Sequence, residues 1–144
     1  MNEYFPSVLV GHCANQYRMS FTVGAHSAGH VRRIVRSYLG EWDLDELADG
    51  VELGVTELLA NVVRHVPDRR CTLVLLRRAD GGGVRVEVAD GSPRLPVAAG
   101  RVSDDSESGR GLVLLDAVVD KWGVGPGPGD GKTVWFECGG AAPS

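Results

Sequence analysis

Several short segments of the chain combine residue types and spacings that suit chemistry. Glu57 and Asn61 stand four residues apart inside an apolar-patterned stretch. On a helix these positions share one face, so a carboxylate and a carboxamide would lie side by side. The carboxamide can hold a magnesium ion, while the carboxylate can orient an attacking hydroxyl group or water. A solvated helix face is the alternative interpretation of this pair.

A second segment contains an aspartate where a hydrophobic strand ends. Val84, Val86 and Val88 alternate with polar residues, and Asp90 follows them directly. Its carboxylate can accept a hydrogen bond from an exocyclic amine such as that of adenine. The small residues at 91 and 92 would let a flat ring approach. A turn aspartate bonded to its own backbone is the alternative.

Glycines mark a third segment. Gly109 and Gly111 flank Arg110 and precede Leu112, at the expected start of a helix. Backbone N–H groups exposed at a helix start form a natural anion site. A flexible hinge with a helix cap is the alternative.

The fourth segment is Gly131-Lys132-Thr133, at the expected start of a strand. A small residue and a hydroxyl group at this place can border a phosphate or a base. An ordinary glycine turn that leads into a strand explains the same residues.

Hydrophobic periodicity predicts the elements that would position these segments. A capping serine at Ser27 and a capping box formed by Asp43 and Glu46 favour two consecutive helices. Pro67 ends the second helix. The predicted order is a strand at 19–23, helices at 27–42 and 43–66, strands at 71–77 and 84–90, an unpatterned lid at 91–108, a helix at 109–120, and strands at 122–124 and 132–138. This order predicts an α+β fold, a two-layer sandwich whose mixed or antiparallel sheet is covered on one face by helices.

Composition narrows the class of protein. The chain has 144 residues and a net charge of −4, which argues against a nucleic-acid-binding or anionic-membrane surface. Cys13, Cys71 and Cys138 are odd in number and lack metal-binding spacing, so neither a disulfide framework nor a zinc site is expected. No signal peptide or membrane span is apparent in the sequence, and we expect a cytoplasmic protein.

Taken together, the ordered segments resemble the Bergerat-fold (GHKL) ATP-binding module, which gyrase and sensor histidine kinases share. The resemblance runs from about Met19 to Phe136. The runs Glu-Leu-Leu-x-Asn-x-x-Arg-His and Asp-Gly-Ser-Pro-Arg-Leu-Pro are similar to those of small stand-alone bacterial anti-sigma factors that are also serine kinases. The implied organisation is a loose arm at 1–16, a histidine-kinase-like ATP-binding domain at 17–138 with a mobile ATP lid, and a flexible tail at 139–144.

The resemblance implies a role for each matching residue. Asn61 would coordinate Mg²⁺, and Glu57 would act as general base or position the hydroxyl group. Asp90 would bind the adenine amino group. The remaining expected nucleotide contacts are Gly91, Gly109, Arg110, Gly111, Leu112 and Thr133.

The family's Asp-x-Gly-x-Gly box reads Asp90-Gly91-Ser92-Pro93-Arg94 in this chain. Both expected glycines are therefore replaced, and the glycine box at the lid is shortened to Gly109-x-Gly111.

The implied function is that of an ATP- and Mg²⁺-binding anti-sigma factor. It would phosphorylate a serine or threonine of an anti-anti-sigma (STAS-type) partner and would sequester a sigma factor. Like its relatives, it would form a homodimer. A non-catalytic docking switch is the alternative, which the replaced glycines favour and Glu57 opposes. A detached histidine kinase domain ranks last, because no helical hairpin with a phospho-accepting histidine precedes the domain.

Overall fold

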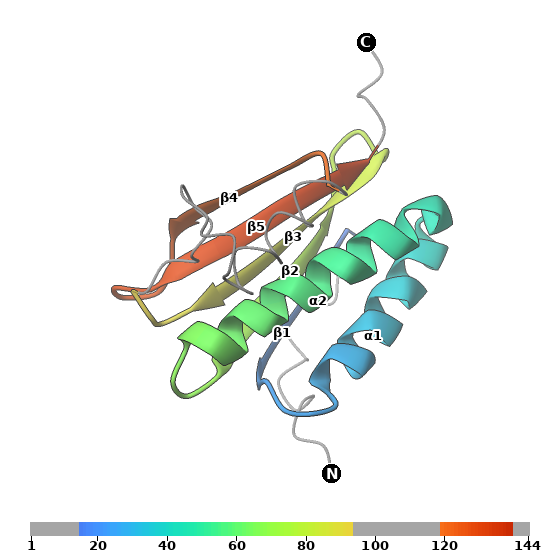
Figure 1. Cartoon of the computed structure of the whole chain (residues 1–144). Coiled ribbons are helices and arrows are strands. Elements are labelled where there is room, and N and C mark those ends of the chain that lie inside the picture. The colour runs from blue at the N-terminus through green and yellow to red at the C-terminus, as the bar shows by residue number, and fades with distance from the viewer. Residues whose placement is uncertain (1–14, 94–118, 140–144) are drawn as a thin grey trace, which may run out of the picture.

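The structure is a computed structural model that describes residues 15–93 and 119–139. In this part of the chain, a sheet forms one layer and helices form the other (Figure 1). The sheet has five strands in the order β1-β2-β3-β5-β4, and each neighbouring pair is antiparallel. The predicted α+β two-layer fold is confirmed. The elements are β1 (Gln16–Thr22), α1 (Ser27–Glu41), the 3₁₀ turn η2 (Asp45–Leu47), α2 (Ala48–His65), β2 (Arg70–Arg77), β3 (Gly83–Asp90), β4 (Lys121–Pro126) and β5 (Lys132–Gly139).

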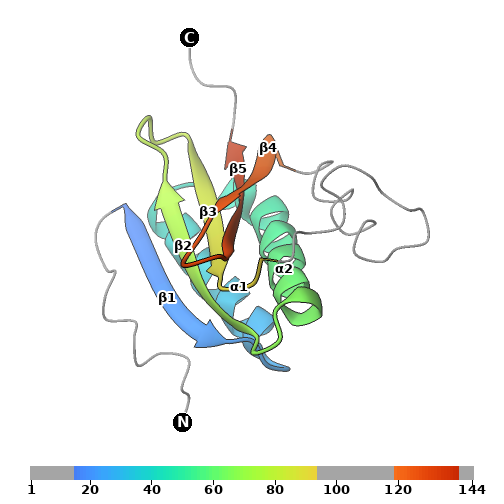
Figure 2. The same cartoon turned by 90° about the vertical axis from the view of Figure 1, so that its left-hand side faces the viewer.

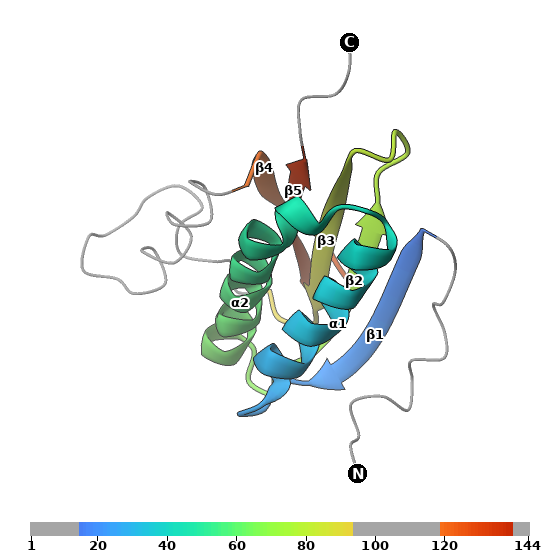
Figure 3. The ribbon, with the colours of Figure 1, turned by 90° about the vertical axis from the view of Figure 1, so that its right-hand side faces the viewer.

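Both long helices lie on the same face of the sheet (Figures 2 and 3). Helix α1 buries a stripe at Val31, Val35 and Leu39, spaced by one helical turn. Helix α2 has a longer buried stripe and contacts β3 and β5. This apolar contact positions α2, and with it the Glu57 and Asn61 pair, over the centre of the sheet. No helix in the described ranges is long and apolar enough to cross a membrane.

The structure differs from prediction where the two helices meet. Asp43 adopts a left-handed backbone conformation with a φ of 59°, and the N–H of Leu44 bonds the carbonyl of Leu39 at 2.8 Å. This reversal buries Leu44, and α2 begins only at Ala48, without a side-chain cap. The predicted capping box at Asp43 is therefore wrong, because the short connection between antiparallel helices requires a reversal there.

The start of α1 also differs in detail. Ser27 is the first residue of the helix, and its hydroxyl oxygen accepts a hydrogen bond from the N–H of Gly24 at 2.7 Å. The serine thus stabilises the turn that precedes the helix rather than capping the helix itself.

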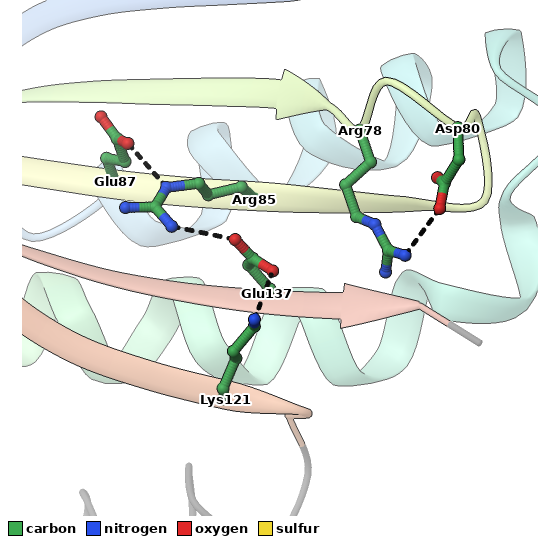
Figure 4. Close-up of polar contacts among 6 residues, drawn as sticks. All are labelled: Arg78, Asp80, Arg85, Glu87, Lys121 and Glu137. Atoms are coloured by element: carbon green, nitrogen blue, oxygen red, sulfur yellow. Dashed lines mark hydrogen bonds and ion pairs between the residues drawn. The ribbon is translucent and has the colours of Figure 1, made fainter. Parts of the chain in front are cut away.

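The other face of the sheet has no described helix over it and carries charged side chains (Figure 4). Arg85 bonds Glu87 at 2.7 Å and Glu137 at 2.9 Å, and its guanidinium lies 4.1 Å from the ring centre of Trp135. Gly123 makes room for this indole, since a Cβ there would lie 2.8 Å from Trp135. Polar and aromatic side chains therefore cover the side of β3 and β5 that faces away from the helices. We refer to this side as the open face.

Several sequence-based expectations fall outside the described ranges. They are the arm up to residue 14, the lid from residue 94, residues 109–118 of the helix expected at 109–120, and the tail from residue 140. Gly109, Arg110, Gly111 and Leu112 belong to this group. Residues 119 and 120, the described end of that expected helix, form a bend before β4. At the margins of the predicted domain, β1 begins at Gln16 and β5 ends at Gly139.

Two helical glycines, Gly54 on α2 and Gly29 on α1, differ in the space around them, which predicts opposite effects of their substitution. A Cβ at Gly54 would lie 2.5 Å from the fully buried ring of Phe136, whereas a Cβ at Gly29 meets nothing closer than 4.0 Å. Gly54→Ala should lower the free energy of unfolding by about 1–3 kcal/mol through overpacking. Gly29→Ala should raise it by about 0.5–1 kcal/mol through helix propensity. Urea denaturation measures both, and a stabilising Gly54→Ala would contradict the tight contact.

Candidate nucleotide site

A buried ion pair occupies the place where β3 ends and β5 begins. Asp90 and Lys132 are cross-strand partners, and Oδ1 of Asp90 lies 3.0 Å from Nζ of Lys132. Their side chains are only 3% and 5% exposed, respectively. Both face the helices, because Asp90 continues the inward alternation of β3 and Lys132 begins that of β5. Such a pair is tolerated inside a protein only when further hydrogen bonds compensate for lost hydration.

Ser92 provides part of that compensation and joins the strand end to α2. Its N–H bonds Oδ1 of Asp90 at 2.8 Å, and its carbonyl accepts a bond from Nζ of Lys132 at 3.3 Å. Its hydroxyl group donates to the carbonyl of His65, the last residue of α2, at 3.1 Å. The residue that replaces a family glycine thus holds the ion pair and the helix end together.

Asn61 lies one turn before this helix end, and Glu57 lies one turn earlier. At about 1.5 Å of rise per residue, they stand about 6 and 12 Å along the axis from His65. Asn61 is 5% exposed, and its Nδ2 has no hydrogen-bond partner in the described part of the chain. Glu57 is half-buried. Asn61 is therefore no member of a solvated face, which was the alternative interpretation, and its amide is held inside at a cost.

Cys71 lies beside Asp90, at the start of β2. Burial, together with the nearby negative charge of Asp90, raises the pKa of the Cys71 thiol to about 12. The thiol therefore stays protonated at neutral pH and is chemically inert. It contributes a small, weakly polar wall next to the carboxylate.

Thr133 does not join this cluster. It follows Lys132, so strand alternation turns its side chain to the open face, where its hydroxyl donates to the carbonyl of Pro126 at 3.0 Å. The inward position belongs to Lys132. Lys132 was not predicted to be a site residue, although the buried alternation of Val134, Phe136 and Cys138 indicates its orientation.

Gly131 precedes the inward lysine for a steric reason. A Cβ at this position would collide with the carbonyl oxygen of Asp90 and lie 2.7 Å from Cα of Gly91. The glycine allows the two backbones to approach and so brings Lys132 against Asp90. Gly91 itself borders open space.

A hollow of about 720 Å³ lies at the same end of the sheet, where β1 and β3 end and β2 begins. Its lining includes Ser20, Arg70 and Thr72, together with Ala89 and Pro128. Ser20 and Thr72 already bond each other across β1 and β2 at 2.8 Å. Asp90, Gly91 and Cys71 also line the hollow, so it reaches the end of β3 that carries the candidate aspartate.

The sequence profile of the histidine kinase-like ATPase domain matches residues 21–137. The match includes Glu57, Asn61, Asp90 and Lys132. The chain belongs to this family. In this histidine kinase-like ATPase domain, Asp90 lies at a strand end and Asn61 lies on the neighbouring helix.

One protein sequence and one solved structure are similar to this chain. An uncharacterised protein of Streptomyces coelicolor is 39% identical over 90 residues, which cover 62% of this chain and 85% of that protein. A chain in the crystal structure of the SiaB–SiaC complex from Pseudomonas aeruginosa has the same fold, with a TM-score of 0.56 and 15% identity. That similarity covers 84% of this chain and 86% of the other.

The residues of this ATPase domain fit a magnesium nucleotide. Among the described residues, nothing donates a hydrogen bond to Oδ2 of Asp90, which leaves an acceptor for an amino group. The unpaired Nδ2 of Asn61 is a hydrogen-bond donor that a phosphate oxygen would satisfy, while the amide oxygen is the atom that would bind a metal ion. Mg²⁺ is commonly held by one or two protein oxygens together with substrate phosphates, so one asparagine oxygen is a sufficient protein ligand.

The buried pair predicts strong coupling between Asp90 and Lys132. Asp90→Asn and Lys132→Met should each lower the free energy of unfolding by about 3–5 kcal/mol, because each leaves the other polar group poorly compensated. The double variant should lose clearly less than the sum of the two losses. Urea unfolding of the four proteins gives the coupling energy. Additive losses would show that the ion pair does not form.

Proposed function

We propose that the chain binds Mg²⁺–ATP and transfers the γ-phosphoryl group to a serine or threonine of an anti-anti-sigma (STAS-type) protein. In this proposal it is an anti-sigma factor, which sequesters a sigma factor while that partner is phosphorylated. The observation that carries the proposal is the cluster on α2 and β3. Glu57 and Asn61 lie on a helix whose end is bonded through Ser92 to the adenine-type aspartate, Asp90.

Each residue has a definite task in this proposal. Asp90 accepts a hydrogen bond from the base, and the oxygen of Asn61 holds Mg²⁺. ATP supplies the phosphoryl group. Glu57 positions the acceptor hydroxyl and receives its proton. Phosphoryl transfer depends mainly on positioning and charge neutralisation, which a site of a few residues can provide.

Family membership supports nucleotide binding, and the runs around Glu57 and Asp90 support the anti-sigma branch. A protein partner agrees with the solved neighbour of the same fold, which is described in a complex of SiaB with SiaC. The expected homodimer and the phosphate contacts of Gly109, Arg110, Gly111 and Leu112 belong to the same proposal, as does cytoplasmic action.

A non-catalytic docking switch is the second candidate. The ion pair favours it, because Lys132 and Ser92 already occupy Oδ1 of the adenine-type aspartate. In this alternative the domain binds nucleotide without transferring phosphate, or binds its partner without nucleotide. The two candidates differ in whether Glu57 has a chemical role.

Asn61 provides the test of magnesium nucleotide binding. In the wild type, Mg²⁺–ATP at about a hundred times its dissociation constant should add about 2.7 kcal/mol of stability. Asn61→Ala should lose this gain while its own unfolding free energy stays within about 1 kcal/mol of wild type, because the substitution also removes an unpaired buried amide. Thermal melts with and without Mg²⁺–ATP measure both quantities. Val63→Ala is the control, an exposed position on the same helix.

A Mg²⁺-dependent shift of wild-type size in Asn61→Ala would refute the metal assignment. Absence of any shift in the wild type would refute nucleotide binding altogether.

Glu57 separates the kinase from the docking switch. Glu57→Gln keeps the shape but removes the basic carboxylate, so phosphoryl transfer should fall by about 10²- to 10⁴-fold while Mg²⁺–ATP binding persists. γ-labelled ATP assays against candidate STAS-type proteins measure the transfer rate. The control is Glu52→Gln on the same helix, whose carboxylate pairs with Arg36. A Glu57→Gln protein with the wild-type rate contradicts the catalytic role, and a wild type that labels no partner supports the switch.

A further inference from the structure

Lys132 presents a buried ammonium group inside the candidate nucleotide site. Its side chain is 5% exposed and contacts Oδ1 of Asp90 at 3.0 Å and the carbonyl oxygen of Ser92 at 3.3 Å. A lysine ammonium is rarely buried, and it is retained only with paired charge and satisfied donors. Core packing alone does not require such a group, because apolar side chains fill the next inward positions of β5 at Val134 and Phe136.

The two hydrogen bonds leave one donor unused. An ammonium group carries three N–H bonds, and in the described part of the chain the third meets no acceptor. Oδ2 of Asp90 likewise receives no hydrogen bond there. The ion pair therefore offers one free donor next to one free acceptor, fixed by β3, β5 and Ser92. A flat ligand that offers an acceptor next to a donor complements this arrangement.

The 6-amino edge of adenine has this pattern. Its ring nitrogen N1 accepts a hydrogen bond, and its 6-amino group donates one. We propose that Lys132 reads the base directly, with Nζ donating to N1 while Oδ2 of Asp90 accepts from the 6-amino group. This inference rests on the proposed function, because it assumes that the site binds ATP. It makes Lys132 a specificity-determining residue and gives the ion pair a role in recognition.

The same arrangement rejects guanine placed in the same way. Guanine has an N–H at position 1 and a carbonyl oxygen at position 6, so a donor would face Lys132 and an acceptor would face Asp90. Buried groups left with a mismatched partner discriminate strongly between such bases. A hydrogen bond from a charged donor is also stronger than one from a neutral donor, so the loss of N1 alone should be measurable.

The experiment compares four nucleotides by isothermal titration of the full chain in Mg²⁺: ATP, 1-deaza-ATP, 7-deaza-ATP and GTP. The analogue 1-deaza-ATP has a C–H group in place of N1, and 7-deaza-ATP is the matched control that keeps N1. Relative to ATP, we expect 1-deaza-ATP to bind about 10- to 100-fold more weakly. We expect 7-deaza-ATP to bind within about twofold, and GTP to bind at least as weakly as 1-deaza-ATP.

Variants add a second measurement. Lys132→Met should bind ATP and 1-deaza-ATP with equal affinity, since the donor to N1 is gone. Lys121→Met, which removes an exposed lysine on β4, should keep the wild-type discrimination. The wild-type comparison of nucleotides stands by itself if Lys132→Met does not fold.

The failures can be told apart. Equal wild-type affinity for ATP and 1-deaza-ATP, or GTP binding equal to ATP binding, overturns the role of Lys132 and leaves the proposed function standing. A wild type that binds no ATP overturns both. Tighter ATP binding by Lys132→Met than by the wild type would show that the lysine blocks the base pocket, which also overturns the inference.

Discussion

Strand alternation beneath a single helical layer is the constraint on which the rest of this structure depends. Lys132 and Thr133 are neighbours in the chain, yet one faces α2 and the other faces the open side of the sheet. Asp90 and Ala89 differ in the same way on β3. A slip of one residue between β3 and β5 would replace the buried ion pair by side chains of the opposite face. The chemistry of the site is therefore a property of strand register as much as of residue type.

Register alone would not bring the helix residues to this strand end. Two contacts set the position of α2: Gly54 lies against the ring of Phe136 on β5, and the carbonyl of His65 accepts the hydroxyl of Ser92. Asn61 lies between these two points along the helix. The close glycine contact governs how near α2 approaches the sheet, and the serine bond governs where its end stops. Together they hold an amide and a carboxylate in one layer although they come from distant parts of the chain.

The sequence predicted those parts of the site that depend on local patterns. The apolar stripe of α2 places Glu57 and Asn61 on adjacent turns, and the alternation of β3 places Asp90 at its end; both elements are present in the structure. The start of α2 was mispredicted, because burial of Leu44 in the turn between helices is a tertiary effect. Lys132 was missed because lysine is ordinarily exposed. That expectation was given more weight than the strand alternation, which places position 132 on the inward face. The contacts expected from Gly109 to Leu112 remain predictions.

Gly131 has an implication for how such a site diverges between related proteins. Any side chain there collides with the backbone of Asp90 and Gly91, so this position is closed to variation by the fold itself. At position 132, by contrast, it is the side chain that supplies the ammonium group beside the aspartate. Ligand preference can therefore change through substitution at position 132, while Gly131 preserves the backbone approach. Lineages of this domain would then be expected to differ in base selectivity while their backbones remain superimposable.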